Sequence, residues 1–258
     1  MAGYAEIEQA IKMPGMRIVL PPRVPGPWGE AIKGVLYVKK IPYIKVRHDR
    51  ADYSSLVGWT AQSSTPVLVY NDERPRSVWN DQINLAERLQ PAPPLIPEAI
   101  DNRVAMFGLC NLIAGENGFG WTRRLTIAQA MLDDARDNEI AYKGALAFGL
   151  KYGYSPEAAA AAPAKCAEMI ATIAHRLERQ HALGSRYLIG DRLSAVDIYW
   201  AAFAGVIKPL SEELCPTSPR MRKYYESPGP IVLAATTPQL LAHRDFIYHE
   251  YLELPVDL

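Results

Sequence analysis

The chain has 258 residues, of which 49% are hydrophobic and 22% are charged. Lys and Arg together number 28, as do Asp and Glu, so the formal net charge at pH 7 is zero. This balance shows neither the electrostatic footprint of a nucleic-acid-binding protein nor a polybasic membrane patch. No apolar run reaches the roughly 18 residues of a membrane span. The N-terminal residues show no charged segment followed by an apolar run, and we therefore expect a cytoplasmic protein.

The first third of the chain alternates strand-like and helix-like segments. Residues 1–15 are interpreted as an N-terminal extension that ends at Pro14-Gly15. Apolar runs predict strands over residues 17–20, 43–46 and 67–70, and helices over 28–39 and 78–89. Residues 76–77 are predicted to be a short strand or an extended segment, and residues 47–63 to be irregular. This order predicts a four-stranded mixed sheet with helices on both faces.

Four prolines within residues 90–97 indicate a stiff linker and the best domain boundary. Beyond this linker the pattern is helical. The helices are expected over residues 97–114, 121–138, 139–150, from Ser155-Pro156 onward, 165–183, and from Thr237-Pro238 to about 251. Pro163 is expected either to start a new helix or to kink the existing one. His243 and His249 are six residues apart, do not share a helix face well, and are interpreted as surface residues.

The most specific local pattern lies in residues 185–207. Gly190-Asp191 indicates a tight turn, and Ser194 with Asp197 forms a capping pair for the helix that follows. Because residues 198–207 are almost entirely apolar, this helix is predicted to lie inside the protein. We interpret Asp197 as a structural cap with no part in catalysis.

The residues that ligate metals or form disulfides show no clustering that favours either role. The three cysteines are far apart: Cys110, Cys166 and Cys215. Four acidic residues lie close together: Asp133, Asp134, Asp137 and Glu139. A solvated helix face explains such an acidic run more often than a metal site does. We therefore expect no disulfide framework and no metal.

Three segments together resemble the cytosolic glutathione transferase superfamily. Residues 187–198, Tyr-Leu-Ile-Gly-Asp-Arg-Leu-Ser-Ala-Val-Asp-Ile, are similar to its "YLxGDxLTxADI" segment. Residues 64–69 look like its "xVPVL" segment, whose proline is cis, and residues 17–43 match its first strand, helix and second strand in spacing. The resemblance implies an α/β thioredoxin-like domain followed by an all-α domain. The implied division is an extension (1–15), a thioredoxin-like domain (16–90), a linker (91–97) and a helical domain (98–258).

This resemblance implies a glutathione S-transferase-like enzyme that takes glutathione as co-substrate. Glutathione would pair with the backbone around Thr65 and Pro66, and a small apolar electrophile would bind in the cleft between the domains. The family usually dimerises, so a homodimer is expected. The alternative is a non-catalytic binding or interaction protein that keeps the fold and has lost thiol activation.

The usual catalytic Ser or Cys of the family falls on Gly26, which has neither hydroxyl nor thiol. No Ser, Thr, Cys or Tyr occurs between residues 17 and 36. Any thiolate stabilisation must then come from backbone amides or from another side chain. Trp28, Arg23 and Tyr4 are the nearby candidates, and the catalytic group stays unassigned.

The remaining candidate residues concern the carboxylate site of glutathione and the binding site of the second substrate. In the glutathione carboxylate site the family has Glu or Gln followed by Ser. Either Trp79 and Asn80 take these places, or Arg76 and Ser77 do, with Ser77 as helix cap. Aromatic residues could line the apolar cleft: Trp28, Phe107, Phe119, Trp121 and Tyr199. Three arginines could hold an acidic substrate group, although such arginines are more often solvated or paired with acids: Arg103, Arg123 and Arg124.

Overall fold

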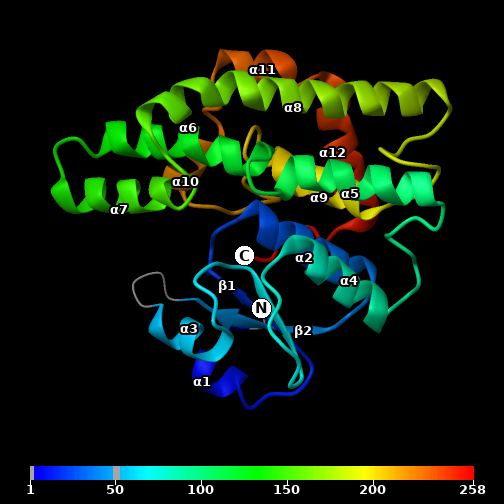
Figure 1. Cartoon of the computed structure of the whole chain (residues 1–258), viewed down its shortest axis with the longest axis horizontal. Helices are drawn as coiled ribbons and strands as arrows, with labels where there is room; N and C mark the ends of the chain where they lie inside the picture. Colours follow the sequence, from blue (N-terminus) through cyan, green and yellow to red (C-terminus); the bar gives the residue numbers. More distant parts are fainter. Residues whose placement is uncertain (1–2, 49–52) are drawn as a thin grey trace.

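A computed structural model describes residues 3–48 and 53–258 of the chain. A small sheet flanked by helices forms one part of the molecule, and a second, entirely helical part lies against it (Figure 1). The expected order, an α/β part followed by an all-α part, is therefore confirmed. No helix in the described ranges is long and apolar enough to cross a membrane.

The sheet has three strands in the order β2-β1-β3. β1 (Met16–Leu20) pairs in parallel with β2 (Tyr43–Arg47) and antiparallel with β3 (Val67–Tyr70). The predicted fourth strand is wrong, since it is reduced to a single bridge between Leu68 and Arg76. Pro75 has no N–H to extend the ladder, and Ser77 already leads into a helix. The N-terminal extension adds a bridge between Ala5 and Val46 at the opposite edge.

Helices cover both faces of the sheet, as the sequence predicts. On one face, α1 (Ile7–Ala10) and α3 (Ser54–Thr60) pack against the valines of the three strands. On the other face lie α2 (Pro27–Val38) and α4 (Trp79–Leu89), which join the main core. The expectation of an irregular segment at 47–63 is wrong for α3, while residues 49–52 lie outside the described residues.

The helical part contains the remaining elements. They are α5 (Ile100–Ala114), α6 (Phe119–Asp134), α7 (Glu139–Leu150), α8 (Pro156–Ala182), α9 (Ala195–Ala204), α10 (Pro219–Tyr225), α11 (Pro230–Ala235) and α12 (Pro238–Tyr251). Pro163 starts no new helix, because it lies inside the single long helix α8 that crosses the top of Figure 1. The expected caps are present: the side chains of Ser155 and Thr237 accept from the first turns of α8 and α12.

Helix α9 lies at the centre of the core, since every one of its residues is buried. It packs against α2 of the α/β part and against α5 and α12 of the helical part. A single hydrophobic cluster therefore runs through both parts of the molecule. This confirms the prediction of a buried helix at this position.

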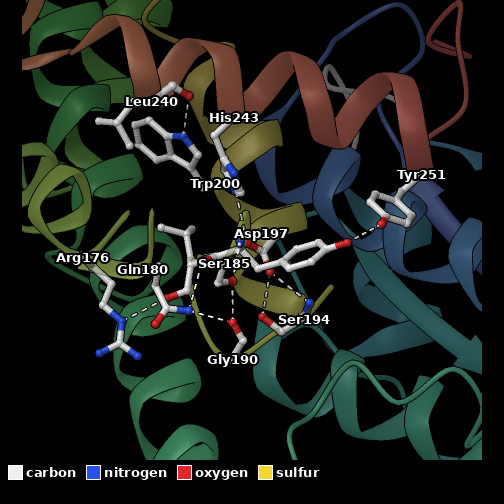
Figure 2. A network of polar contacts seen from close by, with 12 residues as sticks. Arg176, Gln180, Ser185, Gly190, Ser194, Asp197, Trp200, Leu240, His243 and Tyr251 are labelled. Atoms are coloured by element: carbon white, nitrogen blue, oxygen red, sulfur yellow. Dashed lines mark hydrogen bonds and ion pairs between the residues drawn. The ribbon is translucent and has the colours of Figure 1, made fainter. Parts of the chain in front are cut away.

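Asp197 organises a buried polar network at the start of α9 (Figure 2). Its carboxylate accepts from Leu188 N at 2.7 Å, and from the backbone and hydroxyl of Ser194 at 2.9 Å each. The predicted capping box is thus present. The assignment of His243 to the surface is wrong, because its side chain is buried and its Nε2 lies 3.1 Å from Asp197 Oδ1. Apolar and polar residues are spread around all sides of helix α12, so no apolar stripe marked its buried side.

Candidate functional site

The carboxyl end of β1, the segment before β3 and the start of α2 meet at one edge of the sheet. Val19 pairs with Val67, and this register sets Thr65 and Pro66 beside the end of β1. The Thr65-Pro66 peptide bond is cis, as expected. From β1 the chain passes through a proline-rich loop to Gly26, which is the N-cap of α2.

The start of α2 carries free backbone donors and no side-chain nucleophile. Pro27 occupies the first helical position and has no N–H, so the unpaired amides of the first turn belong to Trp28 and Gly29. These amides and the helix dipole favour an anion at this end. Gly26 has an ordinary backbone conformation, with φ −71°, and a Cβ built there meets no atom within 4 Å.

Helix α4 is tied to the same edge through its buried Gln82. The Gln82 Nε2 donates to the carbonyls of Pro66 and Arg76, at 3.0 Å each. The hydroxyl of Ser77 donates to Gln62 Oε1 at 2.8 Å, and Asn80 Oδ1 is buried with no hydrogen-bond donor among the described residues. Ser77 and Asn80 both lie at the start of α4, the helix that Gln82 ties to the Pro66 segment. The two hydrogen bonds of Gln82, called the Gln82 clamp below, could not be predicted from any pattern in the sequence.

Trp28 and Trp121 belong to one aromatic cluster. The Trp28 Nε1 donates to Ala114 O at 2.8 Å, and its ring lies edge-on to Phe203 at 4.9 Å. Tyr152, which no sequence motif marks as a site residue, stacks with Trp28 at 6.4 Å and lies edge-on to Trp121 at 5.0 Å. The side chain of Trp28 is thus anchored between the two parts of the molecule.

Trp79 and Phe107 form a second aromatic group. The Trp79 ring lies 6.2 Å from Phe107 and 6.0 Å from Tyr199, so it packs onto α5 and α9. Tyr199 in turn stacks with Phe203, which connects the two groups. Phe119 lies in the core beside Trp200. Trp79 therefore contributes to the packing between the two parts, while Asn80 keeps a polar group at the start of α4.

The three candidate arginines have different surroundings. Arg103 is exposed and donates to Pro97 O. Arg123 is buried and donates to the carbonyls of Val206 and Tyr224; burial lowers its pKa to about 10. Arg124 is also buried, beside the ring of Trp28. The more common interpretation, solvated or acid-paired arginines, is wrong for Arg123 and Arg124.

Tyr4 lies on the β2 side of the sheet, away from the Thr65-Pro66 segment. The ammonium of Lys45 on β2 lies 4.9 Å from the centre of the Tyr4 ring, and β2 and β3 flank β1 on opposite sides. Burial raises the pKa of Tyr4 to about 12. Arg23 is exposed in the loop before α2, with a positive φ of 60°.

The surroundings of the cysteines and of the acidic cluster favour a role in packing and ion pairing. The three thiols are free and buried, and burial raises the pKa of Cys166 to about 12 and that of Cys215 to about 11. Members of the acidic cluster pair with neighbouring cations: Asp133 with Arg136, Asp134 with Lys223, and Glu139 with Lys143. Within the described ranges, no three His, Cys, Asp or Glu side chains are arranged to hold a metal ion.

Comparison with solved structures identifies the fold. A rice glutathione S-transferase in complex with glutathione has a TM-score of 0.62 and 16% identity, over 95% of this chain and 93% of its own. This chain has the glutathione S-transferase fold. A glutathione S-transferase of Methylobacillus flagellatus with glutathione bound has a TM-score of 0.59 and 14% identity, over 91% and 95%. The beta-etherase LigF of Sphingobium sp. strain SYK-6 has a TM-score of 0.56 and 16% identity, over 85% and 98%.

At these identities the structural likeness establishes the fold and leaves the activity open. No protein-family model matches the sequence, and no curated protein matches it either. The glutathione S-transferase fold agrees with the α/β and all-α parts described above. The activity has to be argued from the chain's own residues.

Proposed function

We propose that this protein binds glutathione at the edge formed by Thr65, Pro66 and the starts of α2 and α4, and uses its thiol on a small apolar electrophile. The observation that carries the proposal is the convergence of these three backbone features, two of which, the Pro66 segment and α4, are joined by the hydrogen bonds of the Gln82 clamp. Two of the neighbours described above were crystallised with glutathione. The proposed division into a thioredoxin-like domain (16–90) and a helical domain (98–258) assigns glutathione to the first.

Each part of glutathione finds a complementary group at this edge. The peptide backbone of glutathione can add as an extended strand beside Thr65. The γ-glutamyl carboxylate suits the free amides at the start of α4, and the adjoining ammonium suits the partnerless acceptor Asn80 Oδ1. The cysteinyl sulfur then lies toward the start of α2, where free amides favour a thiolate.

The second substrate would bind against the aromatic side chains between the two parts. Trp28, Trp121 and Phe107 are each partly exposed and offer apolar surface there. Holding a thiolate next to a bound electrophile supplies proximity, which accounts for much of the acceleration in such transfers. We also propose a homodimer, the arrangement that the family resemblance implies.

Calorimetric titration with reduced glutathione tests the proposal. We expect one site per chain, with a dissociation constant in the micromolar to low millimolar range. Asn80→Ala should weaken binding about tenfold, because a hydrogen bond to a charged group is lost. Asn84→Ala is the matched control: Asn84 is exposed one turn later on α4 and should leave the affinity unchanged. No heat and no thermal shift at several millimolar glutathione would contradict the proposal.

A binding protein without turnover is the second candidate, and Gly26 favours it. Without a hydroxyl or thiol at this position, the sulfur of a bound glutathione has no side-chain donor from α2 itself. This candidate predicts that glutathione binds to the parent protein but is not consumed in the presence of aryl halide electrophiles.

The effect of a hydroxyl at position 26 can be measured directly. Gly26→Ser should raise kcat/KM with glutathione and an aryl halide about tenfold, since a donor to a charged sulfur is added at a helix start. The backbone conformation and the open space around Gly26 accommodate the new side chain. Gly26→Ala, which adds the Cβ without the hydroxyl, should show no such increase. Equal gains in both variants would exclude a hydroxyl effect.

A further inference from the structure

Arg124 on α6 is a buried cation for which the described residues supply no counter-ion. Only 8% of the residue is exposed, and its Nε has no hydrogen-bond partner among residues 3–48 and 53–258. No carboxylate of the described residues lies within ion-pair distance of it. Its neighbour Arg123 differs, because Arg123 directs its donors to backbone carbonyls and to Thr126.

Aromatic side chains surround the Arg124 guanidinium on three sides. Its carbon lies 5.7 Å from the ring centre of Trp28, 5.8 Å from Phe148 and 5.6 Å from Tyr225. These faces provide a weak cation–π attraction. They do not replace the negative charge or the full set of acceptors that a buried guanidinium requires.

The guanidinium also stands close to the start of α2. Its Nη1 donates to the Tyr225 hydroxyl at 3.3 Å, and that hydroxyl donates to Pro25 O at 3.4 Å. Pro25 directly precedes the N-cap Gly26, and Trp28 is the second residue of α2. Arg124 is therefore linked through the Tyr225 hydroxyl to the residue before the N-cap of α2, and its charge adds to the positive potential of the free amides at this helix start.

We propose that Arg124 supplies the positive charge that faces the sulfur of bound glutathione and stabilises its thiolate. This rests on the function proposed above and assigns the task that a Ser or Cys at position 26 would otherwise perform. An anion seated between the α2 amides and Arg124 gives the buried cation a counter-ion, which none of the described residues provides.

The chemical step is an ionisation of the thiol. The S–H bond breaks heterolytically, the electron pair stays on sulfur, and the proton leaves to solvent. Arg124 does not accept this proton, since a guanidinium remains protonated in proteins. It acts by lowering the pKa of the thiol, as a neighbouring opposite charge does.

Other ionisable groups border the same place and have to be separated from Arg124. Arg123 on α6 carries a second positive charge, and the hydroxyls of Tyr152 and Tyr225 reach the guanidinium. Lys151 lies 5.8 Å from the ring centre of Tyr152. Arg123 is the matched control, because it has the same side chain, precedes Arg124 directly on α6 and is also buried.

The test measures the thiol pKa of bound glutathione from the ultraviolet absorbance of its thiolate over a pH series. In the parent protein we expect a pKa well below that of free glutathione. Arg124→Gln should raise it by about one to three units, and Arg124→Lys should keep most of the depression. Arg123→Gln should leave it within half a unit of the parent. Should Arg124→Gln not fold, Arg124→Met is the second neutral variant.

S-methylglutathione, which cannot ionise at sulfur, distinguishes failure of this proposal from failure of the proposed function. Its affinity should be the same for the parent and for Arg124→Gln within about twofold. If glutathione binds and its thiol pKa is not lowered in the parent, or is equal in parent and Arg124→Gln, Arg124 has no such role. An equal rise in Arg123→Gln also overturns it. If neither ligand binds the parent protein, the proposed function fails, and this assignment fails with it.

Discussion

Asp197→Ala should lower the free energy of unfolding by about 3 kcal/mol or more. The carboxylate is fully buried and accepts from the backbone of Leu188 and from the backbone and hydroxyl of Ser194. Its removal leaves these donors without the acceptor and takes away the carboxylate that faces the buried His243 (Figure 2). The loss therefore exceeds the roughly 1 kcal/mol of an exposed helix cap. Urea unfolding followed by circular dichroism measures it.

Asp191→Ala is the control for this measurement. Asp191 lies six residues earlier in the same turn, is exposed, and has Arg192 as a loose partner at 3.5 Å. Its replacement should change stability by less than about 0.5 kcal/mol. The affinity for glutathione per folded molecule should be the same in both variants. A stability loss in Asp197→Ala no larger than in Asp191→Ala would mean that the carboxylate does not hold the start of α9.

The position of α9 could be predicted because its determinants are local. A turn, a capping pair and an apolar run follow one another within residues 190–207, so no distant residue is needed to specify them. The same is true of Ser155 and Thr237, each of which caps a helix that begins with proline. The extent of the long helix α8 was harder to predict, because Pro163 suggests a helix boundary. In the structure the helix continues through Pro163.

The errors concern residues whose state depends on distant partners. Helix α3 has a single buried apolar anchor, Leu56, which packs under the sheet with α1. Arg76 pairs only with Leu68, since the neighbouring Pro75 cannot donate to a ladder. His243 is buried through its contact with Asp197, which is more than forty positions earlier and on another helix. Periodicity within one segment contains none of this information.

The same division between local patterns and distant contacts applies to the candidate site. The Thr65-Pro66 segment and the start of α2 are continuous stretches, and the sequence located both. It left two registers open at residues 76–80. The structure places both Ser77 and Asn80 at the start of α4 and directs Trp79 to the aromatic residues Phe107 and Tyr199. That Arg124 lies beside Trp28 and Tyr225 follows only from the packing of α2, α6 and α10.

Gly120→Ala should lower the free energy of unfolding by about 2 kcal/mol. A Cβ built on Gly120 would lie 2.3 Å from Phe203 Cε1 and 3.1 Å from Trp28 Cη2. Phe203 is fully buried and packs on Trp28 and Tyr199, so its ring has little room to move. The overlap outweighs the helix propensity that alanine gains over glycine. Urea unfolding measures the loss, and the tryptophan fluorescence spectrum reports the displaced Trp28.

Gly108→Ala on α5 should raise the free energy of unfolding, whereas Gly120→Ala should lower it. Gly108 is exposed, and a Cβ built there meets no atom within 4 Å, so only the helix propensity changes. This variant should gain about 0.5–1 kcal/mol in stability and keep the parent fluorescence. If both alanine variants were stabilised, the contact between α6, Phe203 and Trp28 would be looser than described. Because the same contact holds Trp28 at the start of α2, Gly120→Ala should also weaken glutathione binding, whereas Gly108→Ala should not.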